Sequence, residues 1–255
     1  MLKKRIIPCI LVHDDRAVKS MNFEDYQIMG YPEVAIKSFN SWSADELALI
    51  DIDATMTGAK PNLALITHVS KVCFMPLAVG GGIKTLDDAR SVIKVGADKV
   101  IVNNEARSRP AFITELAAAL GAQAVVVCID IIKTNKGYKV YDYKHKQALD
   151  IDPIIWAKAA QMHGAGELLI QCVHKDGTLD GYDVEFLNDI SKSINIPIIA
   201  LGGAGKSQHI SELFTRAKLI SAAAVSNMLH FNEQSVRLIK KECIENKIPV
   251  REELR

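Results

Sequence analysis

The sequence predicts a (βα)8 barrel formed by two fused half-barrel repeats, and three observations support this fold. Eight short apolar runs alternate with eight longer segments of helical period. The chain has 255 residues, a usual size for an α/β barrel in a single domain. Four motifs also recur in the same order at a nearly constant spacing. A doubly wound sheet would instead have fewer strands and a G-x-G-x-x-G after the first one, which is absent.

The expected strands are mostly apolar throughout, as parallel strands buried on both faces are. They lie at 5–12, 47–52, 75–79, 99–103, 124–129, 167–172, 197–201 and 219–224. The helices are expected near 32–41, 61–71, 86–95, 110–120, 152–163, 184–193, 206–215 and 233–246. Their candidate N-caps include Asp183, Ser207 and Asn232.

The repeats pair the first half of the chain with the second. "PCIL" at 8–11 matches "VCID" at 127–130, and "VGGGIK" at 79–84 matches "LGGAGK" at 201–206. No linker-like segment separates the halves, so we expect one domain over 1–255 with half-barrels at roughly 1–120 and 121–255. The second half carries an additional segment, 133–147, whose alternating Tyr and Val around Lys-Gly predict a β-hairpin.

Charge and cysteine usage exclude several classes of protein. The 31 basic and 30 acidic residues give no overall field that would attract nucleic acid or an acidic membrane. No apolar run approaches the roughly 18 to 20 residues of a membrane span. The basic and then apolar N-terminus is too short for a signal peptide and is expected to be the first strand. Five cysteines without C-x-x-C spacing predict reduced thiols in the cytoplasm and no zinc site.

Two glycine clusters follow the third and seventh strands, at Gly80–Gly82 and at Gly202, Gly203 and Gly205. Bare backbone N–H groups between a strand and a helix can bind an anion at the helix N-terminus. Small polar residues one unit later, Asn103 with Asn104 and Ser226 with Asn227, could complete each cup. Two such cups suit an elongated ligand with a phosphate at each end. The alternative is that these glycines only permit tight turns.

Acidic residues at the carboxyl ends of the strands are candidates for proton transfer. Asp130 ends an otherwise apolar strand, where burial of a lone carboxylate would raise its pKa and suit a general acid or base. Asp176 in "HKDGT" fits a turn as well as it fits catalysis or ligand binding. His13 and His174 lack metal-ligand spacing and are expected to be solvated. The polar segment 14–31, with Lys19, is expected to be a loop that can close as a lid.

Charged residues stand at the opposite ends of four strands. They are Arg5, Glu46, Lys99 and Glu167. Their mixed signs predict a ring of salt bridges across the barrel bottom, and the repeat pairs Glu46 with Glu167. A ring that opens would gate a passage along the barrel axis. Ordinary solvated strand ends are the alternative.

These motifs together resemble the cyclase subunit of imidazole glycerol phosphate synthase over nearly the whole chain. The matching stretches include "GADKVIVNNEA", "GAQAVVVCID", "HKDGTLDGYD" and "IIALGGAGK". The resemblance implies a glutaminase partner at the barrel bottom, no metal or other cofactor, and ammonia passing a gate to a phosphorylated substrate. By position it assigns the gate to Arg5, Glu46, Lys99 and Glu167, the glutaminase interface to Asp98, and the lid lysine to Lys19. It assigns phosphate binding to Gly81, Gly82, Asn103, Gly202, Gly203 and Ser226.

The resemblance also places one catalytic acid at Asp130 and the other at position 11, where this chain has Leu11. Leucine transfers no proton. Leu201, before the second glycine cluster, is a further departure. Stretches such as "PCILVHDDRAVKSMNF" and "CFMPLAVGGGIKTLDDA" are similar to a divergent branch linked to acetamidino modification of nucleotide-activated sugars. That branch implies ammonia delivery to a separate sugar amidotransferase. The histidine-pathway cyclase and a scaffold that only activates the glutaminase are the alternatives.

Overall fold

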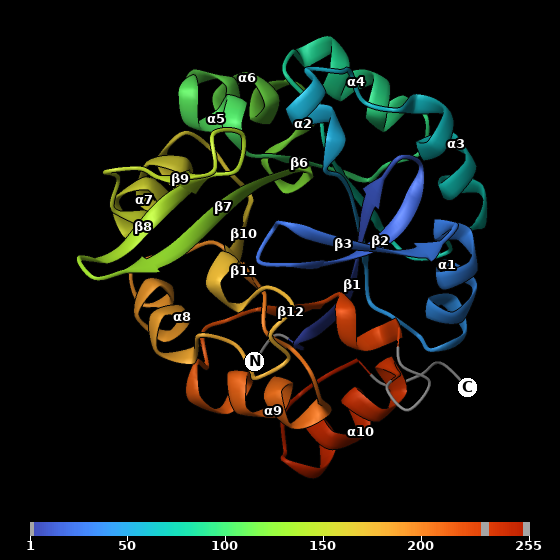
Figure 1. Cartoon of the computed structure of the whole chain (residues 1–255), viewed down its shortest axis with the longest axis vertical. Coiled ribbons are helices and arrows are strands. Elements are labelled where there is room, and N and C mark those ends of the chain that lie inside the picture. Colours follow the sequence, from blue (N-terminus) through green and yellow to red (C-terminus); the bar gives the residue numbers. More distant parts are fainter. Residues whose placement is uncertain (1–2, 231–234, 252–255) are drawn as a thin grey trace.

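The computed structural model describes residues 3–230 and 235–251, and eight parallel strands in it close into a barrel (Figure 1). The barrel strands are β1 (Arg5–His13), β4 (Leu47–Asp51), β5 (Leu77–Gly80), β6 (Lys99–Val102), β7 (Val125–Thr134), β10 (Glu167–Cys172), β11 (Ile198–Leu201) and β12 (Ala222–Val225). Neighbours follow this chain order, and β10 closes the ring by pairing with β7 on one side and β11 on the other. The predicted (βα)8 fold is confirmed.

Helices surround the barrel in the predicted order. The longer ones are α1 (Pro32–Ser41), α3 (Leu63–Val72), α4 (Leu86–Lys94), α6 (Ala111–Leu120), α7 (Pro153–Met162), α8 (Val184–Ser191), α9 (Ser207–Arg216) and α10 (Val236–Glu245). Short helices α2 (Asp53–Thr57) and α5 (Asn104–Ser108) were not predicted. The Asp183 side chain caps α8 as expected, whereas Ser207 is wrong as an N-cap because Lys206 holds that position. Asn232 and the predicted start of the last helix at 233 lie outside the described residues.

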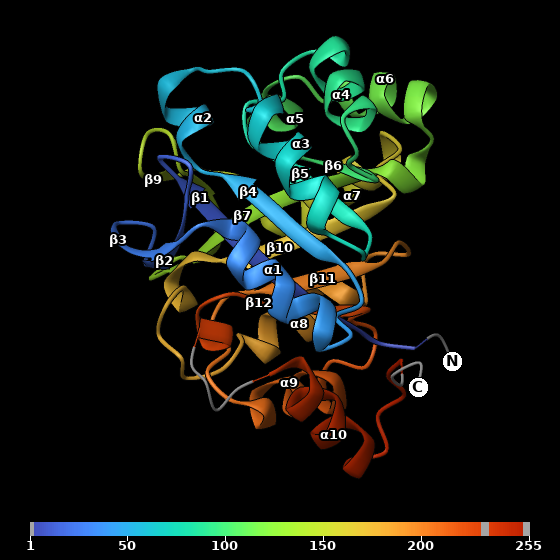
Figure 2. The same ribbon diagram turned by 90° about the vertical axis from the view of Figure 1, so that its right-hand side faces the viewer.

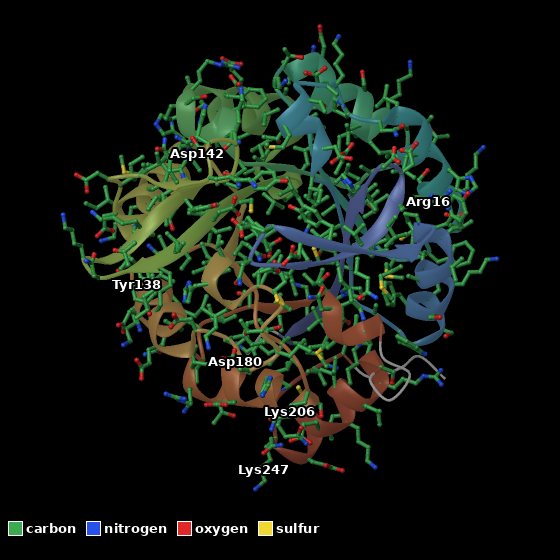
Figure 3. The ribbon with its side chains drawn as sticks, viewed as in Figure 1. Arg16, Tyr138, Asp142, Asp180, Lys206 and Lys247 are labelled. Atoms are coloured by element: carbon green, nitrogen blue, oxygen red, sulfur yellow. The ribbon has the colours of Figure 1, made fainter. Side chains whose placement is uncertain are left out.

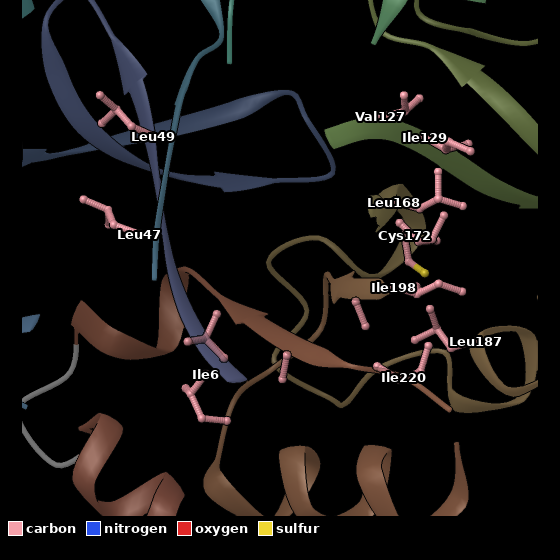
Figure 4. Packing of buried hydrophobic residues seen from close by; sticks show 14 of the residues in the cluster. Ile6, Leu47, Leu49, Val127, Ile129, Leu168, Cys172, Leu187, Ile198 and Ile220 are labelled. Carbon is pink, nitrogen blue, oxygen red and sulfur yellow. The ribbon is translucent and has the colours of Figure 1, made fainter. Parts of the chain in front are cut away.

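Two apolar layers hold the barrel together. Alternate residues of β1 point in opposite directions, so that Ile6 and Ile10 pack against the helices while Ile7 and Cys9 face the lumen. The outer layer runs between strands and helices, as Figure 4 shows for Leu168, Leu187 and Ile198. The lumen is filled mainly by small and branched residues: Ile7, Ala48, Ala78, Val126, Leu169, Ile199, Ala222 and Ala224. The barrel axis is therefore apolar below its mouth.

Two hairpins rise from the mouth. The segment predicted as a polar lid loop is instead an antiparallel hairpin, β2 (Arg16–Met21) and β3 (Asp25–Gly30), whose β2 pairs with the end of β1. This hairpin crosses the centre of the ring in Figure 1 and lies at the mouth end of the barrel in Figure 2. The prediction of an irregular loop was wrong because the segment forms two paired strands. The turn between them contains Asn22 and Phe23, which both have positive φ angles. The predicted hairpin at 133–147 is confirmed as the end of β7 with β8 (Gly137–Asp142), followed by β9 (Gln147–Ala148).

The remaining sequence predictions concern cysteines and membrane segments. All five cysteines are free, and Cys9, Cys128, Cys172 and Cys243 are buried. Within 3–230 and 235–251, no helix combines the length and apolar character needed to cross a bilayer.

Candidate functional site

A cavity of about 370 Å³ opens at the carboxyl ends of the strands. Its lining brings together most of the predicted site residues, although they come from distant parts of the chain. They are Gly81, Gly82, Asn103, Asp130, Asp176 and Ser226. Leu11 and Leu201 line it as well. Lys19 on β2, Gly202 and Gly203 are not among the lining residues.

Asp130 lies deep in this cavity and has few polar partners. Its Oδ2 accepts a hydrogen bond from Asn103 Nδ2 at 2.8 Å, and Cys128 Sγ is 3.5 Å from Oδ1. Burial raises the pKa of Asp130 to about 6, and Asp176 adds to this, while the bonds from Asn103 and Cys128 oppose it. The carboxyl group can therefore exchange a proton near neutral pH.

The place of Asp130 in the first half of the barrel is taken by Leu11. Asp130 pairs in register with Gln171 on β10, whereas Leu11 pairs with Ile50 on β4. The cavity is consequently polar at this level on one side and apolar on the other. Among its lining residues, a carboxylate stands on β7 beside Gln171 of β10 but not at the corresponding point of β1.

Asp176 is buried and is bonded to the β2–β3 hairpin. Its Oδ2 accepts hydrogen bonds from Ser20 Oγ and from the Phe23 backbone N–H, the latter at 3.3 Å. Burial raises the pKa of Asp176, and the two hydrogen bonds oppose the shift. No sequence pattern indicates these partners, because they lie more than 150 positions away. Asp176 thus combines a place in the cavity wall with a structural contact to the hairpin.

The four predicted charges at the barrel bottom form a closed ring. Arg5 Nη1 lies 2.8 Å from Glu46 Oε2, and Arg5 Nη2 contacts Glu167. Lys99 Nζ lies 2.8 Å from Glu46 Oε1 and 3.0 Å from Glu167 Oε2. Each cation therefore contacts both carboxylates across the axis. Both glutamates are buried. The alternative of solvated strand ends is wrong. Asp98 is exposed beside the ring, and its Oδ2 accepts the Leu77 backbone N–H at 2.8 Å.

The chain is similar to known proteins over nearly its whole length. The family model described as "Histidine biosynthesis protein" matches residues 5–235. The imidazole glycerol phosphate synthase subunit HisF of Pelodictyon phaeoclathratiforme is 42% identical over 251 residues, which cover 98% of this chain and 100% of that protein. The chain belongs to this HisF-type family. A putative imidazole glycerol phosphate synthase subunit hisF2 of Vibrio vulnificus is 39% identical, with 98% of this chain and 92% of that protein covered.

This HisF-type barrel carries further polar residues at the mouth that the sequence reasoning missed. Arg107 Nη2 on α5 bonds Asp142 Oδ2 at 3.0 Å, and His145 Nδ1 lies 3.0 Å from the same oxygen. Tyr26 and Tyr143 join the two mouth hairpins through their hydroxyl groups, which are 3.1 Å apart. Figure 3 shows Asp142 beside the β7–β8 hairpin. The sequence around a polar Arg or Tyr does not show whether its side chain will line a cavity or lie in solvent. These residues could therefore not be predicted as part of the site.

The two loop histidines differ in their surroundings. His13 is partly exposed and lies 2.6 Å from Asp53 Oδ1. His174 was expected to be solvated, which is wrong: it is largely buried, and its Nε2 lies 2.9 Å from Asp183 Oδ2. The same Asp183 oxygen accepts the Tyr138 hydroxyl at 2.8 Å. His174 therefore stabilises the loop before α8 and does not line the cavity.

Proposed function

We propose that this chain is the ammonia-using subunit of a glutamine amidotransferase of the imidazole glycerol phosphate synthase type. A glutaminase subunit docks at the barrel bottom beside Asp98 and releases ammonia there. Ammonia passes the charged ring, crosses the lumen and reacts in the mouth cavity with a phosphorylated ligand. The observation that carries the proposal is the alignment of three features on one axis: the closed ring, the apolar lumen and the cavity with Asp130.

The charged ring is the gate in this proposal. Each carboxylate meets both cations, so movement of Lys99 away from Glu46 and Glu167 opens one side while Arg5 still holds the two glutamates. Buried ion pairs compensate the cost of removing their charges from water only while both partners remain in place. Docking of the glutaminase would supply the new partner that Lys99 needs in the open state.

The cavity residues perform the chemistry. The backbone N–H groups around Gly81 and Gly82, close to the α4 N-terminus, bind the phosphate of the ligand. Ammonia leaving the lumen attacks a carbonyl carbon of the ligand, the carbonyl π electrons move to the oxygen, and Asp130 transfers a proton from the attacking nitrogen to that oxygen. A carboxylate with a pKa of about 6 is largely ionised at neutral pH, yet it is a stronger base than an ordinary aspartate.

The similarity to HisF subunits favours the histidine-pathway reaction, in which ammonia is used to form imidazole glycerol phosphate. A second candidate is delivery of ammonia to a separate amidotransferase that makes acetamidino sugars in surface-polysaccharide synthesis. One observation favours it: Leu11 leaves Asp130 without a second acid at the opposing strand end. The relatives named above do not carry that activity in their names. We therefore place the histidine-pathway reaction first.

Gate variants test the ammonia path. We expect Lys99→Met to reduce glutamine-dependent product formation at least about ten-fold in the complex with the glutaminase, while added ammonium salt at the open mouth still supports turnover. Lys192→Ala, which removes a surface pair with Asp189, is the control and should change neither rate. Unchanged glutamine-dependent transfer in Lys99→Met would show that the ring is not the gate.

The reaction itself is tested with the isolated chain, ammonium salt and the histidine-pathway bisphosphate. Formation of imidazole glycerol phosphate at rates near one per second would be expected of a working cyclase. No product under these conditions, together with intact glutaminase stimulation, would favour the second candidate.

A further inference from the structure

Asp130 and Gln171 stand side by side on the wall of the barrel. They are paired in register on the parallel strands β7 and β10, so both side chains point to the same face of the sheet. Both residues are buried, and both line the mouth cavity. Two positions earlier on the same strands, Cys128 and Leu169 face the lumen. The carboxyl and amide groups therefore mark the level at which the apolar lumen gives way to the cavity.

The internal repeat shows that these two residues occur together. Leu11 stands in the place of Asp130, and the same repeat matches "DELALID" around β4 with "GELLIQC" around β10. Ile50 therefore corresponds to Gln171. Leu11 and Ile50 are themselves paired in register on β1 and β4. At this level one half of the barrel has a carboxyl group beside an amide, and the other half has two apolar side chains.

The Gln171 amide and the Asp130 carboxylate can both accept further hydrogen bonds. Gln171 Oε1 is buried and has no hydrogen-bond partner among the described residues. A buried carbonyl in a cavity wall is commonly satisfied by a ligand or water, and a half-turn of the amide exchanges Oε1 with Nε2. Asp130 accepts from Asn103 at Oδ2 and contacts Cys128 at Oδ1, but each of its oxygens has two lone pairs. Two neighbouring acceptors are the result.

Two neighbouring acceptors need a ligand that donates two hydrogen bonds at once. The side chains directly below the pair are Leu169, which has no donor, and Cys128, whose weak thiol donor already contacts Asp130. Ammonia has three N–H bonds, so it can donate to both acceptors and keep its lone pair free. Water has two donors as well and is the competing occupant.

We infer that Gln171 and Asp130 hold ammonia where the lumen meets the cavity. Gln171 Oε1 and the Asp130 carboxylate each accept one N–H, and the nitrogen lone pair faces the phosphorylated ligand. This inference rests on the proposed function and adds Gln171 as the residue that positions the nucleophile. Leu11 and Ile50 accept no hydrogen bond, so ammonia is held on one side of the barrel axis.

Carbon-13 NMR of the full-length chain tests this binding directly. Ammonium chloride is added at alkaline pH, where much of it is the free base, and potassium chloride is added to a parallel sample to match the salt. The reporters are the side-chain carbonyl carbon of Gln171 and the carboxyl carbon of Asp130. We expect both signals to shift and saturate with ammonia and to stay in place with potassium chloride. If either signal fails to move with ammonia, water is the occupant and the inference is wrong.

Gln171→Met keeps the length of the side chain and removes its polar end. We expect the Asp130 signal in this variant to need about five-fold more ammonia for half-saturation, because one hydrogen bond is lost. Gln147→Met makes the same change at an exposed position on β9 outside the cavity and should titrate like the wild type. Gln171→Leu takes its place if Gln171→Met does not fold. Half-saturation at the wild-type ammonia concentration would overturn the inference.

Turnover with ammonium salt separates positioning of ammonia from general damage to the cavity. Gln171→Met should raise the KM for ammonia about five-fold and leave the KM for the phosphorylated ligand within about two-fold of the wild type. A parallel rise in both KM values would indicate a distorted cavity and would also overturn the inference. The NMR titration needs neither the glutaminase nor the phosphorylated ligand. Absence of wild-type turnover would therefore count against the proposed function, while the titration still decides the inference.

Discussion

Asp130 shows how one residue can be costly for stability and useful for chemistry. It follows five apolar or thiol residues of β7, and within 3–230 and 235–251 only Asn103 and Cys128 offer it side-chain hydrogen bonds. With so little solvation the charged form is disfavoured, and the pKa rises from 3.8 to about 6. A buried carboxylate with a purely structural role would have more hydrogen-bond donors or a cation beside it to offset the loss of hydration.

This pKa shift predicts a pH-dependent effect of Asp130→Asn. The folded state holds its proton to higher pH than the unfolded state does, so wild-type stability falls as pH rises from about 4 to about 6. The variant lacks this loss, and its stability relative to the wild type should rise by about 2 kcal/mol between pH 4 and pH 7. Urea unfolding of both proteins at the two pH values measures the difference. A difference independent of pH would contradict the raised pKa.

Leu11 provides the matching test in the first half of the barrel. We expect Leu11→Asp to introduce a second carboxyl group into the cavity at the level of Asp130, with a raised pKa of its own. If the cavity still fits the histidine-pathway bisphosphate, the variant should gain at least about ten-fold in ammonia-dependent cyclase rate. Leu11→Asn, with the same size and no acid, is the control. Equal rates in the two variants would mean that no proton transfer at position 11 is missing.

For single residues, the sequence predicted where along a strand a charged side chain stands, but it did not predict which residue that side chain bonds. Asp130 and the four ring charges stand at strand ends, where a barrel fixes their direction, so the sequence identified them. The bonds of Asp176 to Ser20 and Phe23 join loops from opposite halves, and the repeat pattern contains no trace of them. The pairing of His174 with Asp183 lies within one loop of the second half, nine positions apart, and was missed because no sequence pattern sets the path of that loop.

The β2–β3 hairpin is the element in which the sequence was least informative. Its strands carry few apolar residues, so the alternation that marks a strand is weak. What stabilises it is pairing with the end of β1 and the bonds to Asp176 and Asn227. The barrel strands were predicted because burial on both faces leaves a strong apolar pattern, whatever their length.

Ser20→Ala tests whether these bonds hold the hairpin in place. Loss of the hydroxyl leaves Asp176 with one donor fewer in a buried position, at a cost of about 1 to 3 kcal/mol. We expect faster hydrogen exchange at the amides of Asn22 and Phe23, whereas exchange in β7 should stay the same. Gln27→Ala on β3 is the control within the hairpin. Unchanged exchange at 22 and 23 would mean that Asp176 does not anchor the hairpin.

At the scale of the whole molecule, adjacent alanines on β12 offer a test of the axial path. Ala222 faces the lumen, and Ala223 faces the helices. We expect Ala222→Leu to reduce glutamine-dependent transfer at least about ten-fold while turnover with ammonium salt persists. Ala223→Leu overpacks the other face at a similar cost of about 1 to 3 kcal/mol and should leave the ratio of the two activities unchanged. Equal ratios in both variants would place the path elsewhere.

The repeat explains why the architecture was predictable and the site only in part. Two similar halves produce corresponding strands, glycine clusters and bottom glutamates, and all of these were found. The halves differ where the β2–β3 hairpin contacts Asp176 and Asn227, and where Leu11 stands in the place of Asp130. The repeat itself shows Leu11 in the place of Asp130, whereas the hairpin contacts join the two halves, and internal similarity cannot reveal them.

Under the proposed function, the apolar lumen above the charged ring determines the form in which nitrogen would travel. An ammonium ion would have to leave its hydration shell to pass Ile7, Ala48 and Leu169, at a cost of many kcal/mol. Neutral ammonia has no such charge to desolvate. The barrel would therefore select by protonation state and deliver a nucleophile with its lone pair available. The supply to Asp130 would then not depend on the small fraction of free base present in neutral solution.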